Sequence, residues 1–337
     1  MVYGPWIDFW MVDIFMNNIL IIKCGSLGDV LRTAGFLKGL REKYAPARVT
    51  WLVYEQAREL LVNNPLIDEL VVYTRADIEK LYARDFEMAL CLEDDRELCA
   101  LASKIRAKQR LGSYVAQDGG ITYAKELAEY FDMSLISRYG KQQADARKKL
   151  NTATYQDILA KGLGIKKAEP VLIFGEENLQ YAQRFAEIHD LKGKAIVGLN
   201  TGAGRRWELK KWNPDKTAQL ADRLMREFGM QVILFGGQEE QDRNEKIKAM
   251  VKGPVIDAGC NHRLLDFAAL VNLCQVLVAS DSLALHIGTA LRKQVIALFR
   301  PTSAAEIDLF GRGKKIVPDM KCVCCYKNTC DKSPNCM

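Results

Sequence analysis

Short apolar runs alternate with segments of helical periodicity along most of the chain. The apolar runs are rich in Val, Ile and Leu, as expected of parallel strands that are buried on both faces. They occupy residues 19–22, 49–53, 70–73, 88–92, 195–199, 231–235, 276–279 and 295–299. Helical spacing of apolar residues occurs over 55–62, 78–83, 98–107, 215–228, 239–251, 264–273 and 283–291. This alternation predicts an α/β protein in which helices cover both faces of parallel sheets.

A stretch that contains Gly162, Gly164 and Pro170 divides the pattern into two halves. Glycine and proline loosen a chain between regular elements, so we place a domain boundary here. The prediction is one parallel-sheet domain over residues 16–172 and a second over residues 173–320.

The two ends of the chain differ from these halves. Residues 1–15 are apolar but carry two aspartates and no basic leader, which argues against a signal peptide or a membrane span. We predict that they are an N-terminal extension, with an amphipathic membrane-contacting segment as the alternative. Residues 321–337 form a cysteine-rich tail.

The segment 19–33 predicts a strand, a glycine-containing turn and a helix. Ser26 can cap the helix, Gly28 frees the backbone, and Asp29 follows directly. An acid at this position faces the carboxyl edge of the sheet, where open α/β sheets bind ligands. The alternative is a first-turn acid that only complements the helix dipole. The pattern Gly-x-x-Gly-Asp is neither the dinucleotide fingerprint nor a Walker A loop, which disfavours a dehydrogenase.

A second polar cluster, which includes Glu93 and Asp94, follows the apolar run at 88–92. It is interpreted either as a substrate-facing loop or as a solvated helix cap. Together with Ser26 and Gly28, Glu93 and Asp94 are our candidates for binding an acceptor. The basic residues further on indicate either a solvated helix face or an electropositive groove for a phosphorylated acceptor. They are Lys104, Arg106, Lys108, Arg110, Arg138, Lys141, Arg147, Lys148 and Lys149.

Three strand ends in the second half carry polar residues. The first is a turn of small residues whose N–H groups can approach an anion closely. The second carries acids that can accept ribose hydroxyls, and the third leads into a helix whose free N–H groups can hold a pyrophosphate. The candidate residues are Thr201, Gly202 and Ala203 in the first, Glu239 and Glu240 in the second, and Asp281, Ser282 and His286 in the third. Three such ends on one sheet edge predict a nucleotide site.

The composition of the chain limits the kinds of molecule that it is expected to bind. The chain has 337 residues, 49% of them hydrophobic, which is enough for two cores. Its net charge of +6 favours acidic partners such as phosphates or an anionic membrane surface, but no nucleic-acid-binding signature is present. Half of the ten cysteines are scattered through apolar elements and are interpreted as buried free thiols of a reducing compartment. They are Cys24, Cys91, Cys99, Cys260 and Cys274.

An ordered set of motifs resembles glycosyltransferase family 9, the heptosyltransferases of the lipopolysaccharide inner core. The opening segment Lys23-Cys-Gly-Ser-Leu-Gly-Asp-Val-Leu-Arg-Thr33 is similar to the family's Lys-x-x-Ser-x-Gly-Asp-Val-x-x-Thr. Lys210-Lys-Trp-Asn-Pro214 is similar to its Lys-x-Trp-Pro element, with one residue inserted. The later elements are resembled by Leu234-Phe-Gly-Gly237, Ser280-Asp-Ser-Leu-Ala-Leu-His286 and Phe299-Arg-Pro-Thr302.

The resemblance implies a GT-B fold, in which two Rossmann-like domains face each other across a cleft. The first would bind the acceptor and the second the nucleotide sugar, which the resemblance implies is ADP-heptose. Asp29 matches the catalytic base of an inverting transfer, and Lys210 matches the lysine that neutralises the leaving diphosphate. No divalent metal would be required. Asp281, Ser282 and His286 match the donor-site motif, although His286 could equally be a helix-packing residue.

Two features depart from the family pattern. Leu283 and Arg300 stand where many members have glycine. The cysteine-rich tail could bind structural zinc, form disulfides in an oxidising environment, or act as a structural clasp as in similar tails of the family. The cysteines concerned are Cys322, Cys324, Cys325, Cys330 and Cys336.

The resulting expectation is a cytoplasmic, monomeric transferase at the inner leaflet of the cytoplasmic membrane, where a lipid-linked acceptor presents its sugars. Three alternatives remain. A family 9 transferase could use another nucleotide sugar. A sugar-nucleotide epimerase would share the fold, and a non-catalytic nucleotide-binding or metal-sensing protein would bind nucleotide without transfer.

Overall fold

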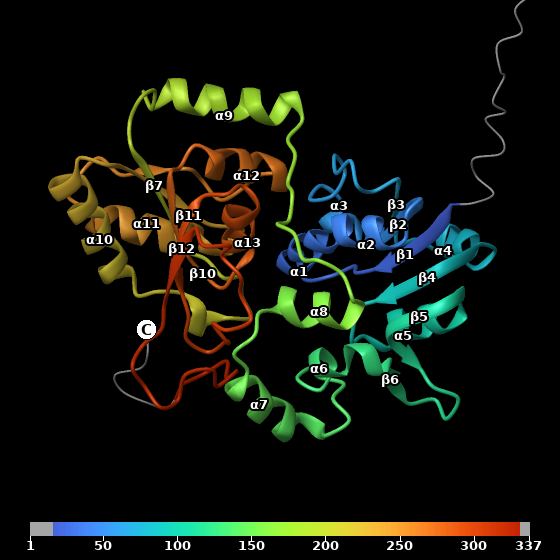
Figure 1. Ribbon diagram of the computed structural model, residues 1–337. Coiled ribbons are helices and arrows are strands. Elements are labelled where there is room, and N and C mark those ends of the chain that lie inside the picture. The colour runs from blue at the N-terminus through green and yellow to red at the C-terminus, as the bar shows by residue number, and fades with distance from the viewer. Residues whose placement is uncertain (1–15, 331–337) are drawn as a thin grey trace, which may run out of the picture.

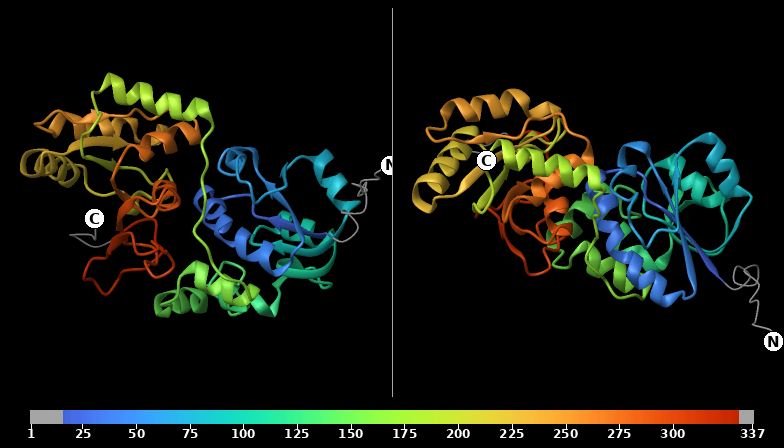
Figure 2. Two further views of the ribbon diagram at one scale, coloured as in Figure 1. Left: turned by 45° about the horizontal axis from the view of Figure 1, so that its top comes forward. Right: turned by 90° about the horizontal axis from the view of Figure 1, so that it is seen from above.

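The computed structural model describes residues 16–330 and contains two sheets that lie side by side, each with helices on both faces (Figures 1 and 2). Predictions about residues 1–15 and about Cys336 lie outside the described residues. Within residues 16–330, no helix combines the length and the apolar character needed to cross a bilayer.

The first sheet has the strand order β3-β2-β1-β4-β5-β6, parallel except for β6. Its strands are β1 (Asn17–Ile22), β2 (Ala47–Val53), β3 (Glu69–Val72), β4 (Asp85–Cys91), β5 (Arg106–Val115) and β6 (Ile121–Tyr123). Its helices are α1 (Leu27–Thr33), η2 (Ala34–Phe36), α2 (Leu37–Lys43), α3 (Glu55–Arg58), α4 (Arg75–Tyr82), α5 (Arg96–Lys104), η3 (Lys125–Leu127), α6 (Ala128–Phe131), α7 (Gly140–Leu150) and α8 (Tyr155–Leu163). Side chains of β1 alternate between two cores, so that Ile19 and Ile21 face one and Leu20 and Ile22 the other.

The second sheet is parallel and has the order β12-β11-β10-β7-β8-β9. Its strands are β7 (Ile196–Asn200), β8 (Gln231–Phe235), β9 (Ile256–Asp257), β10 (Val276–Ser280), β11 (Gln294–Leu298) and β12 (Gly313–Ile316). Its helices are α9 (Glu176–Ile188), η4 (Glu208–Lys210), α10 (Pro214–Phe228), η5 (Gln238–Glu240), α11 (Gln241–Met250), α12 (Leu264–Asn272) and α13 (Leu283–Ala290). Written from β9, this order repeats that of the first sheet. In each sheet the strand order reverses at one point, between β1 and β4 in the first sheet and between β7 and β10 in the second.

The eight strands expected from the apolar runs are all present, and all but β8 have shifted ends. Two helix predictions were wrong in extent. The helix expected over residues 55–62 ends at Arg58. The helix expected over residues 98–107 ends at Lys104, and β5 begins at Arg106. Arg106, Lys108 and Arg110 lie two residues apart, so they share one face of a strand and not a helix.

Candidate active site

The carboxyl ends of the two sheets border one cavity of about 690 Å³. Each sheet contributes at the point where its strand order reverses, which is where open α/β sheets bind ligands. The predicted residues that line it are Ser26, Gly28, Asp29, Gly202, Ala203, Lys210, Glu239, Glu240, Asp281, Ser282 and His286. Thr201 and Glu93 do not line it, and Asp94 lines a smaller neighbouring cavity instead.

The turn between β1 and α1 forms the wall of the first sheet. Ser26 has a left-handed backbone, with φ 53°, and its side chain makes no capping hydrogen bond. The expected cap is therefore absent, because capping requires an extended backbone at that position. A non-glycine residue with positive φ is costly and is frequent where a site must be shaped.

Asp29 lies in the first turn of α1 and points into the cavity. Arg32 Nη2 approaches its carboxylate at 2.9 Å. Burial alone would raise the pKa of Asp29, but the positive charges of Arg32 and Lys23 lower it below its ordinary value. The carboxylate is thus held ionised, which is the state a base requires.

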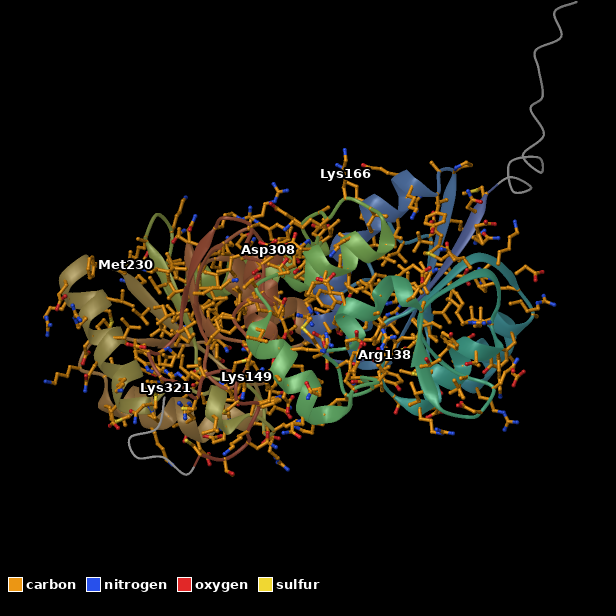
Figure 3. The ribbon with its side chains drawn as sticks, turned by 60° about the horizontal axis from the view of Figure 1, so that its bottom comes forward. Arg138, Lys149, Lys166, Met230, Asp308 and Lys321 are labelled. Carbon is orange, nitrogen blue, oxygen red and sulfur yellow. The ribbon has the colours of Figure 1, made fainter. Side chains whose placement is uncertain are left out.

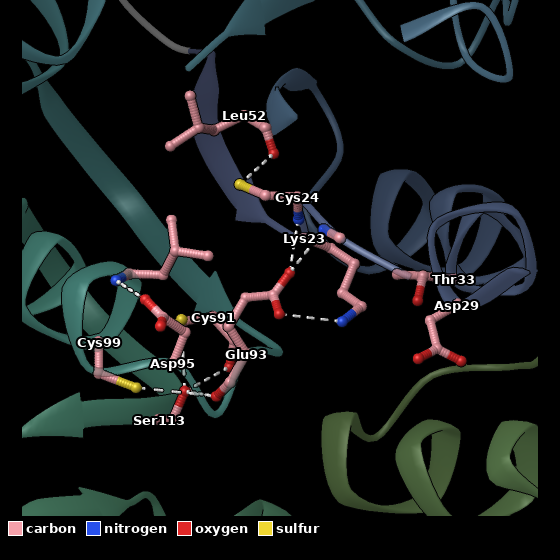
Figure 4. Close-up of polar contacts among 12 residues, drawn as sticks. Lys23, Cys24, Asp29, Thr33, Leu52, Cys91, Glu93, Asp95, Cys99 and Ser113 are labelled. Carbon is pink, nitrogen blue, oxygen red and sulfur yellow. Dashed lines mark hydrogen bonds and ion pairs between the residues drawn. The ribbon is translucent and has the colours of Figure 1, made fainter. Parts of the chain in front are cut away.

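Glu93 supports this turn from behind, as Figure 4 shows. Its carboxylate accepts hydrogen bonds from the backbone N–H of Cys24 at 2.6 Å and of Gly25 at 3.2 Å. It also pairs with Lys23 Nζ at 3.1 Å, and both side chains are buried. A buried carboxylate that is satisfied in this way fixes the turn. We had expected Glu93 to face the acceptor. It does not line the cavity and instead supports the turn.

Lys210 and Asp281 form the centre of the second wall. Lys210 Nζ lies 2.7 Å from Asp281 Oδ2 and 3.0 Å from the Asp281 carbonyl oxygen. Thr302 Oγ1 donates to the same Oδ2 at 2.7 Å. Burial alone would raise the pKa of Asp281, but the charge of Lys210 and these hydrogen bonds lower it.

The small-residue loop after β7 packs tightly against Glu240. A Cβ on Gly202 would lie 2.6 Å from the Glu240 carboxyl carbon, so any larger residue would displace the Glu240 side chain. Glu240 pairs with Lys211 Nζ at 3.2 Å, and Glu239 pairs with Arg205 Nε at 3.1 Å. Thr201 is buried and donates to Asn244 Oδ1 at 2.6 Å, so it anchors the loop from beneath.

His286 on α13 is buried where the two domains touch. A Cβ on Gly28 would lie 2.4 Å from His286 Cδ2. Burial and the nearby Arg32 lower the pKa of His286 to about 4, so the imidazole is neutral at pH 7. The residue both packs between the helices and lines the cavity, so the two alternatives offered by the sequence are not exclusive.

Several lining residues were not predicted from the sequence. Arg32, Thr302, Glu306 and Tyr326 line the cavity with the candidates. Arg32 follows Asp29 by one helical turn, a spacing that could have identified it. Tyr326 lies in the tail, which has no periodic pattern from which its contacts could be predicted.

The basic residues do not form the expected helix face or groove on β5. Arg106 pairs with Asp85 at 3.1 Å and Lys108 with Glu87 at 2.7 Å, while Arg110 donates to three backbone carbonyls. These three side chains are therefore paired with groups of the first domain.

The nine described cysteines are free thiols. Cys260 is only partly buried and lines the large cavity, unlike the other four scattered cysteines. Among residues 16–330, no three His, Cys, Asp or Glu side chains are grouped to hold a metal ion. The zinc prediction for the tail included Cys336, which lies outside that range.

Two Rossmann-like domains with a shared cavity at their carboxyl edges have the architecture of GT-B proteins. Lys210 of the second domain and the Asp29 carboxylate of the first line this one cavity. The glycosyltransferase family 9 (heptosyltransferase) model matches residues 80–335. The chain belongs to glycosyltransferase family 9 and is a glycosyltransferase with a GT-B fold.

Relatives and solved structures agree with this assignment. Lipopolysaccharide heptosyltransferase 1 of Pseudomonas aeruginosa is 25% identical over 334 residues, which cover 94% of this chain and 88% of that protein. A family 9 glycosyl transferase from Veillonella parvula superposes with a TM-score of 0.73 at 22% identity, covering 89% and 87% of the two chains. Escherichia coli ADP-heptose lps heptosyltransferase II gives a TM-score of 0.64 at 19% identity, covering 89% and 90%.

Proposed function

We propose that this enzyme transfers a heptose from ADP-heptose to a Kdo-lipid A or heptosyl-Kdo-lipid A acceptor of the lipopolysaccharide inner core, with inversion and without a metal. Family membership and the names of the relatives above support the sugar and the acceptor. The observation that carries the proposal is that Asp29 from one domain and Lys210 from the other line one cavity.

Asp29 is proposed as the general base. An acceptor hydroxyl gives its proton to the Asp29 carboxylate while its oxygen forms a bond to the anomeric carbon. The bond from that carbon to the diphosphate oxygen breaks in the same step, and ADP leaves with the electron pair. Because the base and the leaving-group cation come from different domains, they suit attack from the face opposite the leaving group, which inverts the anomeric centre.

Lys210 and the start of α13 are proposed to stabilise the leaving diphosphate. Lys210 has three N–H donors and shares its charge with Asp281 before donor arrives. Ser282, Leu283 and Ala284 at the start of α13 line the cavity, and Ser282 makes no side-chain cap. First-turn N–H groups favour an anion, so they can complement Lys210.

Metal independence is supported by the pairing of four of the five carboxylates that line the cavity. Asp29, Asp281, Glu239 and Glu240 each have a cationic partner at 2.7–3.2 Å. A divalent ion would have to displace these cations to gain oxygen ligands. We expect EDTA to leave the transfer rate unchanged, and a large loss that Mg²⁺ restores would contradict this part of the proposal.

Product analysis tests the function. The full chain is incubated with ADP-heptose and each acceptor, and the product is identified by mass and by the anomeric configuration in its NMR spectrum. A heptosylated acceptor of inverted configuration is expected. Turnover of the donor without acceptor would favour an epimerase, and transfer from another nucleotide sugar but not from ADP-heptose would contradict the donor.

A lipid-linked acceptor places the enzyme at the cytoplasmic face of the inner membrane, acting as a monomer. The net charge of +6 supports weak attraction to anionic lipid. We expect the protein to sediment with anionic vesicles more than with neutral vesicles. Equal recovery with both at physiological salt would contradict this placement.

A further inference from the structure

A second cavity of about 170 Å³ adjoins the active-site cavity. The two share Arg32, Glu306 and Tyr326 as lining residues. The other residues of the second cavity, among them Asp94 and Lys148, belong to the first domain. The second cavity therefore begins beside Asp29, on the side of the proposed base.

Tyr326 reaches this junction from the C-terminal segment, residues 317–330, although that segment follows the second sheet. Its backbone N–H donates to the Pro301 carbonyl at 2.7 Å. Its hydroxyl accepts from the Ser303 N–H at 3.2 Å and donates to Glu306 Oε1 at 3.1 Å. These contacts fix the ring and orient the Glu306 carboxyl between the cavities.

Lys148 meets Tyr326 from the first domain. It lies on α7, and its Nζ is 4.3 Å from the centre of the Tyr326 ring, a cation–π distance. Figure 3 shows α7 and the C-terminal segment on the same side of the molecule, with Lys149 and Lys321 labelled. The Tyr326–Lys148 contact thus joins the two domains at the rim of the second cavity.

Two cations, Lys148 and Arg32, line this cavity. The side chain of Lys148 is only 15% exposed, and the Asp145 carboxylate at 3.9 Å is beyond hydrogen-bond distance. Arg32 is buried, stacks 3.7 Å from the centre of the Tyr155 ring, and its Nε has no hydrogen-bond partner among the described residues. An ammonium with no carboxylate within hydrogen-bond distance, beside a guanidinium, gives this cavity a positive lining that suits an anionic ligand group.

The acids of the cavity oppose this attraction only in part. Asp94 is exposed, and burial raises the pKa of Glu306, which favours the uncharged form of its carboxyl group. Glu306 also accepts the Tyr326 hydrogen bond, which engages one of its oxygens.

We propose that the second cavity binds an anionic group of the acceptor, and that Tyr326 is a specificity-determining residue that completes the cavity together with Lys148. This inference rests on the proposed function and adds to it the residues that select the acceptor. Tyr326 is held on the second domain by its hydrogen bonds to Pro301, Ser303 and Glu306, whereas Lys148 belongs to the first domain. The cavity is therefore complete only when the two domains are apposed. The C-terminal segment thereby takes part in acceptor recognition from the donor-binding side of the enzyme.

The test compares Lys148→Gln with Lys149→Gln, its exposed neighbour on α7. ADP release is measured with the Kdo-lipid A saccharide and with its carboxyl methyl ester, and the affinity for ADP is measured by calorimetry. Lys148→Gln should raise the acceptor KM about tenfold, as loss of a charge-assisted hydrogen bond does, with kcat and the ADP Kd within twofold. It should also abolish the preference for the charged acceptor over its ester, and Lys148→Arg should restore much of that preference.

Tyr326→Phe keeps the ring but removes the hydroxyl that orients Glu306. It should raise the acceptor KM several-fold and leave the ADP Kd unchanged. An acceptor KM unchanged in both variants, or an equal rise in Lys149→Gln, would overturn the subsite while leaving the proposed function intact. If the wild-type enzyme transfers no sugar to either acceptor, the proposed function fails first and the subsite fails with it.

Discussion

Asp29 and Arg32 show how one helical turn of spacing sets the chemistry of a residue. Arg32 contributes the positive charge nearest to the carboxylate and lowers the pKa of Asp29 against the effect of burial. The base is therefore ionised before substrate arrives, and the cost of burying it is offset within α1.

Replacing Arg32 tests this effect on ionisation. In Arg32→Met the pKa of Asp29 should rise, so the acidic limb of the kcat/KM profile should move to higher pH. The profile is recorded from pH 4 to 9 beside Arg41→Met, which removes a surface pair with Asp68 in the same domain. An acidic limb that stays in place in Arg32→Met would contradict the proposed control of Asp29.

The lowered pKa of His286 predicts how the stability of the protein depends on pH. The unfolded chain protonates this histidine near pH 6.5, whereas the folded protein does so only at about pH 4. Its contribution is therefore complete above pH 6.5 and is lost as the pH falls toward 4, amounting to about 3 kcal/mol. In His286→Asn, denaturant unfolding should depend less steeply on pH over that interval than in wild type. His189→Asn is the control, and an equal slope in all three proteins would refute the assignment.

Residue-level prediction identified residues that line the cavity where a strand end marked the position. Asp29, Gly202 and Asp281 follow apolar runs, and the carboxyl ends of parallel strands meet at one edge. Glu93 satisfies the same rule but points behind the turn to Lys23, because sequence position does not fix side-chain direction. Tyr326 could not be found, since its contacts depend on how an irregular segment folds back.

At the level of elements, α1 and α13 meet at the domain interface, and Gly28 allows their approach. A Cβ there would lie 2.4 Å from His286 Cδ2, so Gly28→Ala must separate the helices or displace the imidazole. A shift near 1 Å in a catalytic cleft costs on the order of 10²-fold in rate, and we expect kcat/KM to fall by about that factor.

Gly25→Ala is the matched control in the same turn. Its added Cβ would lie 3.7 Å from the Tyr54 ring, an ordinary contact. Steady-state kinetics should therefore remain near wild type in Gly25→Ala. A similar loss in both variants would mean that turn flexibility, and not helix approach, limits the rate.

The strand β5 marks where element prediction fails. Its first half is charged and exposed, so it lacks the apolar run by which eight of the other parallel strands were found. The alternation of cations at every second residue was the available signal, since that period belongs to a strand. Edge strands tolerate such charge because one side of their ladder meets solvent or a short partner.

At the level of the whole molecule, the two sheets share a strand order but differ in what they place at the reversal point. The first supplies a carboxylate and the second a lysine and a glycine-lined loop. The alternation of strands and helices predicted both sheets, because each strand needs a crossover helix. The predicted bounds of 16–172 and 173–320 remain a prediction.

Nucleotide binding should separate the roles of the two domains. We expect ADP to slow amide hydrogen exchange at residues 200–206, at 236–240 and in α13, and to have less effect on β1–β6. The reason is that ligand binding suppresses opening of the structure that contacts the ligand. Protection centred on the first sheet would reverse the donor and acceptor assignments.

The measurement that tests the central claim most directly is the rate of acceptor-dependent ADP release in Asp29→Asn and Lys210→Gln. Both variants preserve side-chain shape better than alanine, and Asp190→Asn and Lys252→Gln are exposed controls. We predict that Asp29→Asn reduces kcat by about 10²-fold or more without changing the ADP Kd, and that Lys210→Gln lowers kcat and weakens ADP binding. Wild-type kcat in Asp29→Asn, with acceptor-dependent release intact, would contradict the assignment of Asp29 as the base.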